Sequence, residues 1–184
     1  MQGLSPIGWA LRPLKNYAKF SGRASRAEFW WFVLFMTLFF TACWILVVAT
    51  VGASLMSGGQ PTMAMMGGMG VLGMIVGLLY LGILIPYIAV QVRRLHDTNR
   101  SGWWVGGFWL LYLIYLVTAF GMGFSTTPGS PPQSLGGLGA IMIVALLFFV
   151  YSIVLLVFFC LRGSQGPNRF GDDPYGADVG EVFA

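Results

Sequence analysis

The chain has 184 residues, of which 57% are hydrophobic and 9% are charged, and its mean hydropathy is +0.78. An ordinary soluble domain has about 25% charged residues, so this composition excludes a water-soluble globular fold. Ten Lys and Arg residues against six Asp and Glu residues give a net charge of +4.

All of these charges lie in three clusters, at residues 12–28, 93–100 and 162–181. Each of the two uncharged stretches between them has room for two transmembrane helices of about 20 residues and a loop. The sequence therefore predicts an all-α membrane protein with four transmembrane helices in two hairpins. The predicted spans are residues 29–50, 71–90, 103–120 and 138–161.

These spans form a membrane domain at residues 29–161, preceded by an arm at 1–28 and followed by a tail at 162–184. In the arm, residues 13–20 are predicted to form a short interfacial helix, because apolar and basic side chains alternate there at helical spacing. Ser25 and Glu28 have the spacing of a capping box before the first span. We interpret Glu28 as a helix cap, with a functional carboxylate as the alternative.

The connectors at residues 52–70 and 121–137 are rich in Gly, Pro, Ser and Met, which predicts loops. Met56, Met63, Met65, Met66 and Met69 lie in the first connector. Packing is the favoured interpretation of this methionine cluster, and a weak Cu(I) site is the alternative. No cofactor is predicted. Cys43 and Cys160 fall inside spans and are expected to be core hydrophobes rather than disulfide partners.

The ten basic residues all lie on one side of the four-span arrangement. Because Lys and Arg in short loops stay in the cytoplasm, both termini are predicted to be cytoplasmic. His96 is the one histidine of the chain, and the predicted spans hold no ionisable Asp, Glu, Lys, Arg or His. This pattern lacks the usual marks of a catalytic triad, a metal site or a proton pathway. We expect no enzyme and no nucleic-acid partner.

Three segments carry a family resemblance: GRASRAEFWWF at residues 22–32, RRLHDTNRSGWW at 93–104 and GPNRFGDDP at 166–174. Together they resemble the signature segments of the bacterial inner-membrane family catalogued as domain of unknown function 805. The resemblance covers about residues 16–174 and implies a small helical protein of the bacterial inner membrane. It implies no activity. The long connector at residues 52–70 departs from short members of that family.

The three segments lie on the same predicted side, so their polar side chains are expected to meet in one group, here called the polar cluster. Asp97 is expected to pair with Arg23, Arg26 or Arg169, and Asn99 and Asn168 are expected to satisfy loop carbonyls. The cluster either neutralises itself and holds the loops together or binds anionic lipid phosphates. Its members are Arg23, Arg26, Glu28, Arg93, Arg94, His96, Asp97, Asn99, Arg100, Asn168 and Arg169.

Three classes of function follow. The favoured one is a non-enzymatic scaffold or lipid-associated module of the inner membrane, with the bilayer and anionic phospholipid headgroups as partners. The first alternative is a small transporter or channel subunit that acts as a homo-oligomer, because four helices with few polar side chains enclose little water. The second is a membrane enzyme that uses arginine, His96 and Asp97 on a lipid phosphate.

Overall fold

The computed structural model describes residues 4–56, 63–124 and 135–174. In these ranges the fold consists of helices and loops, which agrees with the predicted all-α membrane protein. Four of the described helices are long and apolar enough to cross a membrane. The helices are α1 at Pro6–Lys15, α2 at Arg26–Met56, α3 at Met63–Asp97, α4 at Trp103–Phe124 and α5 at Leu135–Cys160.

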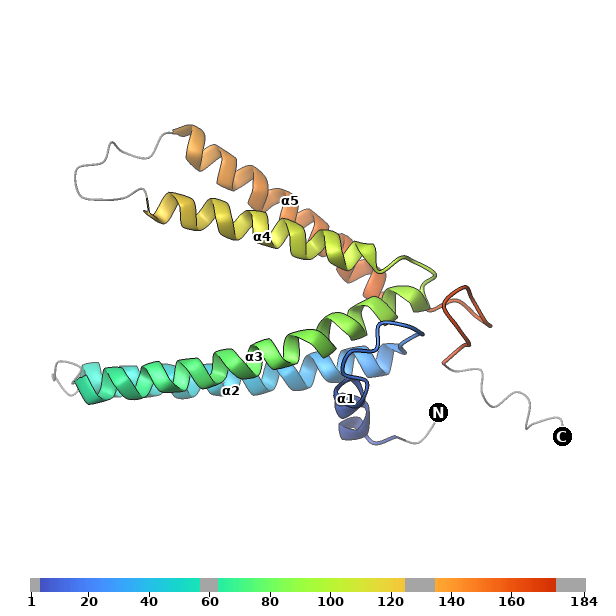
Figure 1. Ribbon diagram of the computed structural model, residues 1–184, viewed down its shortest axis with the longest axis horizontal. Helices are drawn as coiled ribbons and strands as arrows, with labels where there is room; N and C mark the ends of the chain where they lie inside the picture. The colour runs from blue at the N-terminus through green and yellow to red at the C-terminus, as the bar shows by residue number, and fades with distance from the viewer. Residues whose placement is uncertain (1–3, 57–62, 125–134, 175–184) are drawn as a thin grey trace.

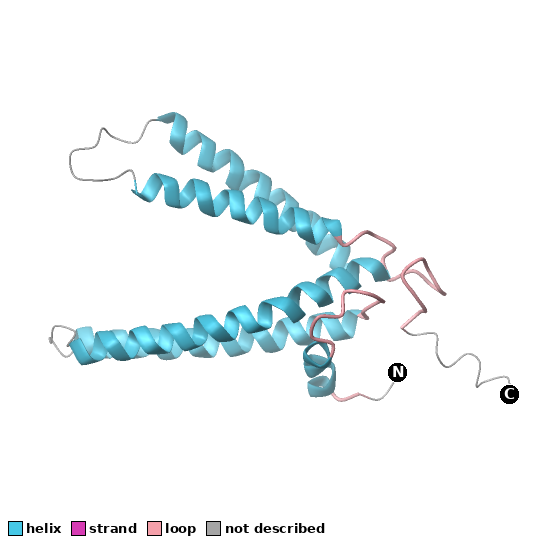
Figure 2. Cartoon of the chain, in the orientation of Figure 1, coloured by secondary structure: helices cyan, strands magenta, loops and turns pink. Residues whose placement is uncertain are grey.

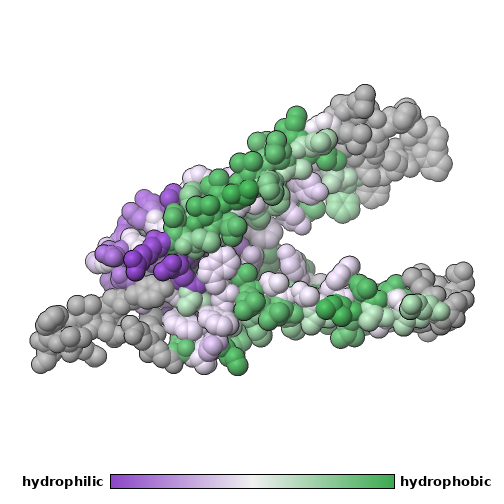
Figure 3. Space-filling model, turned by 180° about the vertical axis from the view of Figure 1, so that it is seen from behind, coloured by the Kyte–Doolittle hydropathy of each residue, from purple (hydrophilic) through white to green (hydrophobic). Residues whose placement is uncertain are grey.

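The long helices form two hairpins, α2 with α3 and α4 with α5, which meet at one end and diverge toward the other (Figure 1). Helix α1 and the described loops lie at the joined end (Figure 2). Hydrophilic residues gather at this end, and hydrophobic residues cover the diverging hairpins (Figure 3). The separation of charge seen in the sequence is therefore also a separation in space, and we call the joined end the charged end.

The hairpin helices are longer than predicted. Helix α2 continues to Met56 and α3 begins at Met63, so most of the connector at residues 52–70 is helical, and its central part lies outside the described residues. The loop prediction failed there because glycine is common in transmembrane helices and methionine is a good helix former. Most of the second connector, residues 125–134, also lies outside the described residues. Helix α3 runs past residue 90, where the predicted span ends, and continues to Asp97. The first charged residues mark the end of the apolar span, but they do not end the helix.

The interfacial helix lies earlier in the chain than predicted. Helix α1 covers Pro6–Lys15 rather than residues 13–20. Ser5 is its N-cap, with the side chain accepting a hydrogen bond from the Gly8 amide at 3.2 Å, and Pro6 occupies the first turn. The prediction took Pro13 as the start, whereas Pro13 lies inside the helix. Helix α1 packs closely along α2 at the charged end.

The hydrophobic core lies where the two hairpins meet. Phe29 of α2 contacts Phe159 of α5, with ring centroids 4.6 Å apart. Other buried core residues are Ala24, Phe32, Met36, Val90, Leu95, Val105 and Leu155. Only 6–11% of the most apolar window of each span is buried. The hairpins are thus joined at their base and present apolar side chains along the rest of their length. Cys160 was expected to be a core residue, but it is exposed.

Pro86 lies inside α3 and removes one hydrogen bond of the helix, and a side chain of the arm replaces it. Proline has no backbone N–H, so the Gly82 carbonyl one turn earlier lacks its usual donor. The Tyr17 hydroxyl donates a hydrogen bond to this carbonyl at 2.5 Å. An unsatisfied carbonyl is costly in a membrane, where water cannot replace the missing donor. The bond therefore fixes the segment after α1 against α3.

This arrangement predicts a dependence of Tyr17 on Pro86. Tyr17→Phe should lower the free energy of unfolding by about 1–2 kcal/mol, because it leaves the Gly82 carbonyl without a donor. In a Pro86→Ala background the same change should cost much less, because alanine at this position supplies the missing N–H. A double-mutant cycle measured by unfolding in mixed detergent micelles tests this. An equal cost in both backgrounds would contradict it.

Candidate functional site at the charged end

Glu28 lies in a buried ion pair rather than only in a helix cap. The Ser25 hydroxyl accepts a hydrogen bond from the Glu28 amide at 3.1 Å, which is the first half of the expected capping box. The Glu28 carboxylate turns instead toward α3 and α1. Its Oε1 accepts a hydrogen bond from Arg93 Nη1 at 2.6 Å, and its Oε2 lies 3.5 Å from Arg12 Nε. Glu28 is 2% exposed, so this contact joins three helices in a dry environment.

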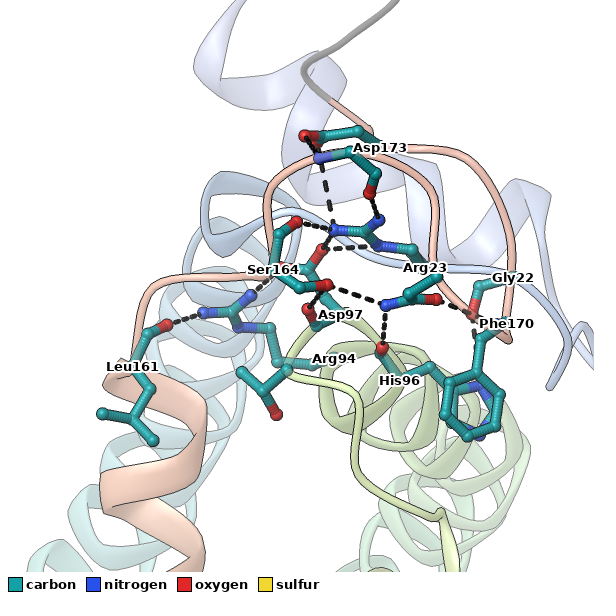
Figure 4. Close-up of polar contacts among 12 residues, drawn as sticks. Gly22, Arg23, Arg94, His96, Asp97, Leu161, Ser164, Phe170 and Asp173 are labelled. Carbon is teal, nitrogen blue, oxygen red and sulfur yellow. Dashed lines mark hydrogen bonds and ion pairs between the residues drawn. The ribbon is translucent and has the colours of Figure 1, made fainter.

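A second buried ion pair is centred on Asp97, the last residue of α3. Its Oδ1 accepts a hydrogen bond from Arg23 Nε at 3.0 Å and lies 2.9 Å from Arg23 Nη2. Its Oδ2 accepts a hydrogen bond from Arg94 Nη1 (Figure 4). All three side chains are almost completely buried. Arg23 is one of the three partners proposed for Asp97 from the sequence, and Arg94 is an additional one.

Arg94 also connects α3 to the end of α5. Its Nε donates to the Phe159 carbonyl at 3.1 Å, and its Nη2 donates to the Leu161 carbonyl. The last carbonyls of a helix have no intrahelical donor and carry the negative end of the helix dipole. A guanidinium placed there donates hydrogen bonds to these carbonyls, and its positive charge interacts favourably with the negative end of the dipole. Arg94 therefore ties the second hairpin to the first.

The segment after α5, residues 161–174, folds back over the end of α3, and we call it the C-terminal strap. Arg23 donates from Nη1 to the Gly166 carbonyl at 2.6 Å and from Nη2 to the Ser164 carbonyl at 2.5 Å. The Ser164 amide donates to the Asp97 carbonyl at 2.8 Å. A Cβ atom on Gly163 would lie 2.6 Å from Asp97 Cγ, so the close approach requires glycine. Arg23 and Asp97 thus hold the strap through its backbone.

The strap also covers His96. The His96 ring stacks on Phe170 with centroids 3.9 Å apart and planes 3° apart, and its Nδ1 donates to the Gly22 carbonyl at 3.2 Å (Figure 4). Asn168 Nδ2 donates to the His96 carbonyl at 2.9 Å, so this asparagine satisfies a loop carbonyl as expected. These contacts bring the arm, the end of α3 and the strap together around His96.

Asn99 contributes through its backbone. It has φ +57°, a left-handed conformation that asparagine tolerates, and its carbonyl accepts a hydrogen bond from Arg169 Nη2 at 3.2 Å. Arg100 lies over the Phe158 ring, 3.8 Å from its centroid, and Arg26 is exposed at the start of α2. The polar cluster therefore comprises two buried ion pairs, a stacked histidine and exposed basic side chains.

Sequence reasoning missed several residues of the site. Arg12 was not predicted to contact Glu28, and Asp173 was not assigned to the site, although its carboxylate accepts a hydrogen bond from the Gly166 amide at 3.0 Å. Gly163 and Ser164 were also missed, because they act through a close approach and through main-chain groups that leave no pattern of side-chain types. The available signal for the strap was its glycine-rich, polar composition directly after the last span.

The whole polar cluster lies within a stretch that matches a known family model. The model is described as "Protein of unknown function (DUF805)" and matches residues 17–172. Inner membrane protein YhaH of Escherichia coli K12 is 34% identical over 168 residues, which are 91% of this chain and 97% of YhaH. Inner membrane protein YhaI of the same strain is 34% identical over 169 residues, which are 90% of this chain and 94% of YhaI. No solved structure matches the chain.

The geometry of Asp97 predicts a large effect of its removal. Asp97→Ala leaves Arg23 and Arg94 buried without their carboxylate, and breaking a buried ion pair in this way costs about 3–5 kcal/mol. We expect a strongly reduced folded yield and a lower melting temperature in detergent.

The matched control is Asp172→Ala, which removes an exposed carboxylate from the same strap. A surface change of this kind should alter stability by about 0.5 kcal/mol or less. Equal and negligible effects of the two substitutions would show that the Asp97 contacts do not hold the charged end together.

Proposed function

We propose that this chain, which belongs to the DUF805 family of inner membrane proteins, is a non-enzymatic scaffold that binds anionic phospholipid headgroups at its charged end. The observation that supports this is a division of roles among its charges. The carboxylates of Glu28 and Asp97 are buried and paired with arginines. The exposed basic side chains at the same end are Lys15, Lys19, Arg26, Arg162 and Arg169.

Exposed cations next to a membrane domain have a natural ligand in lipid phosphate. Each Lys or Arg near an anionic membrane surface contributes about 1 kcal/mol of attraction. An arginine also binds phosphate through two parallel hydrogen bonds. The Glu28 and Asp97 carboxylates are paired with buried arginines, so among the described residues the five exposed cations outnumber the exposed carboxylate of Asp172. The charged end therefore offers headgroups a basic surface.

The contacts of the titratable residues argue against an enzyme. Both carboxylate oxygens of Asp97 are engaged by arginines, and the side chain is 1% exposed. The His96 ring is stacked on Phe170 and bonded to the Gly22 carbonyl. A general acid or base has to reach its substrate, and these two side chains are held in structural contacts. We therefore propose that His96 and Asp97 stabilise the fold.

The groove between α2 and α3 supports a scaffold over a transporter. It has a volume of about 470 Å³, and its lining is mainly apolar, with Val33, Phe40 and Trp44 among its residues. Hydroxyl groups of Thr37 and Tyr80 are among its polar atoms. A hydrophilic substrate needs a more continuous polar path than this lining provides. A transporter or channel would have to build that path between copies of the chain, as a homo-oligomer.

The proposal includes an orientation with both termini in the cytoplasm. It is supported by the ten basic residues, which all lie in the arm, at residues 93–100 or in the tail, and therefore on one side of the four spans. Reporter fusions after Thr98 and after Ala184 should be cytoplasmic, and fusions after Gly59 and Gly129 should be periplasmic. Alkaline phosphatase and green fluorescent protein fusions distinguish the two compartments. A periplasmic fusion after Thr98 would refute the orientation.

The proposed function predicts that the amount of anionic lipid bound to the protein decreases when the exposed basic side chains are neutralised. A variant with Lys15→Gln, Lys19→Gln, Arg26→Gln, Arg162→Gln and Arg169→Gln should copurify with at least several-fold less phosphatidylglycerol and cardiolipin. The reason is that each lost cation removes about 1 kcal/mol of attraction. Mass spectrometry of extracted lipid, normalised to phosphatidylethanolamine, measures the change.

The matched control exchanges Lys for Arg and Arg for Lys at the same five positions, which keeps every charge. It should retain the anionic lipid of the parent protein. The same lipid content in the neutral and the charge-conserving variants would contradict the proposed function.

A further inference from the structure

We propose that the groove between the start of α2 and the end of α5 is a binding site for one anionic phospholipid, with the phosphate on Arg26 and an acyl chain along Leu34. This inference rests on the proposed function and gives it a specific site. The groove has a volume of about 510 Å³. It is lined by Arg26, Ala27, Trp30, Trp31 and Leu34 of α2 and by Cys160 of α5.

The groove runs from the charged end into the apolar part of the hairpins. Arg26, Trp30 and Leu34 follow one another at intervals of four residues, so they lie along one face of α2. At 1.5 Å per residue, Arg26 and Leu34 are about 12 Å apart along the helix axis. Arg26 is the first residue of α2 and marks the polar mouth of the groove. Leu34 lies at the inner end.

From Arg26 through Trp30 to Leu34, the side chains change from charged to amphipathic to apolar. A phospholipid changes in the same order, from its phosphate through its glycerol esters to its acyl chains. A guanidinium binds phosphate through paired hydrogen bonds. Indole rings favour the zone between headgroups and hydrocarbon, which contains the glycerol esters. The leucine side chain suits an acyl chain. Trp30, Trp31 and Leu34 are 37%, 39% and 46% exposed, so a lipid can enter from the bilayer without a rearrangement of the helices.

The charges around the mouth favour an anionic headgroup over a zwitterionic one. Arg162 is exposed two residues after Cys160 and adds a second cation at this end of α5. The Phe159 and Leu161 carbonyls, whose negative ends would repel phosphate, already accept hydrogen bonds from Arg94. A headgroup of net charge −1, such as phosphatidylglycerol, is therefore better matched to the groove than phosphatidylcholine, whose ammonium cancels its phosphate.

Cys160 provides a probe inside the groove, because its thiol is free and exposed. The full-length protein with Cys43→Ala, purified in a non-ionic detergent, reports the reaction of Cys160 with N-ethylmaleimide. Added phosphatidylglycerol should slow this reaction at least fivefold, and phosphatidylcholine at the same concentration should not. Arg26→Gln should remove the protection by phosphatidylglycerol, whereas Arg26→Lys should retain part of it.

Arg169→Gln is the matched control, because Arg169 is an exposed arginine of the charged end that does not line the groove. It should keep most of the protection, because Arg169 adds only to the general basic surface and does not line the groove, and equal melting temperatures of the variants would show that folding is unchanged. Equal protection by the two lipids, no protection, or the same result for Arg26→Gln and Arg169→Gln would overturn the site. If Cys160 is not protected but the five-site variant loses anionic lipid, the groove proposal fails and the proposed function stands. Failure of both measurements refutes both.

Discussion

The contact between the Asp97 carboxylate and two arginines is the interaction on which the arrangement of the hairpins depends. Arg23 belongs to the arm, Arg94 and Asp97 belong to α3, and the remaining hydrogen bonds of the two arginines go to the end of α5 and to the strap. One carboxylate therefore connects the arm, α3, the end of α5 and the strap. The hydrophobic core lies at the same end, and only 6–11% of the most apolar window of each span is buried, so the contacts that join the hairpins are concentrated at the charged end.

Such a contact is stable only when the cost of removing charge from water is offset by hydrogen bonds. A buried ion pair on its own contributes little net stability, because desolvation can exceed the Coulombic attraction. Here the donors of Arg94 are used at the Phe159 carbonyl, the Leu161 carbonyl and the Asp97 carboxylate. A lysine has a single nitrogen and no planar fork, so it does not reproduce these three directions. The geometry accounts for the choice of arginine at this position.

The sequence was sufficient to predict the four long apolar helices, the grouping of the described charged residues at one end and Arg23 as one of three partners for Asp97. These properties depend on hydropathy and on the positions of charges, which are visible along the chain. The role of Arg94 was not predictable in this way, because an arginine one turn before an aspartate is compatible with many contacts. The strap was missed for a different reason. Its contacts with Arg23 are made by the Ser164 and Gly166 carbonyls, and any residue type carries a carbonyl.

The same charge asymmetry links the fold to the proposed lipid binding. Arg12, Arg23, Arg93 and Arg94 surround the carboxylates of Glu28 and Asp97, so the internal network is itself richer in cations than in anions. The exposed basic side chains add to that excess rather than neutralising it. In the orientation that we propose, this end faces the anionic surface of the cytoplasmic leaflet, which attracts basic side chains. The proposed orientation in the membrane and the proposed attraction of anionic lipid are then two consequences of one distribution of charge, and the groove at Arg26 is where that charge borders an apolar surface.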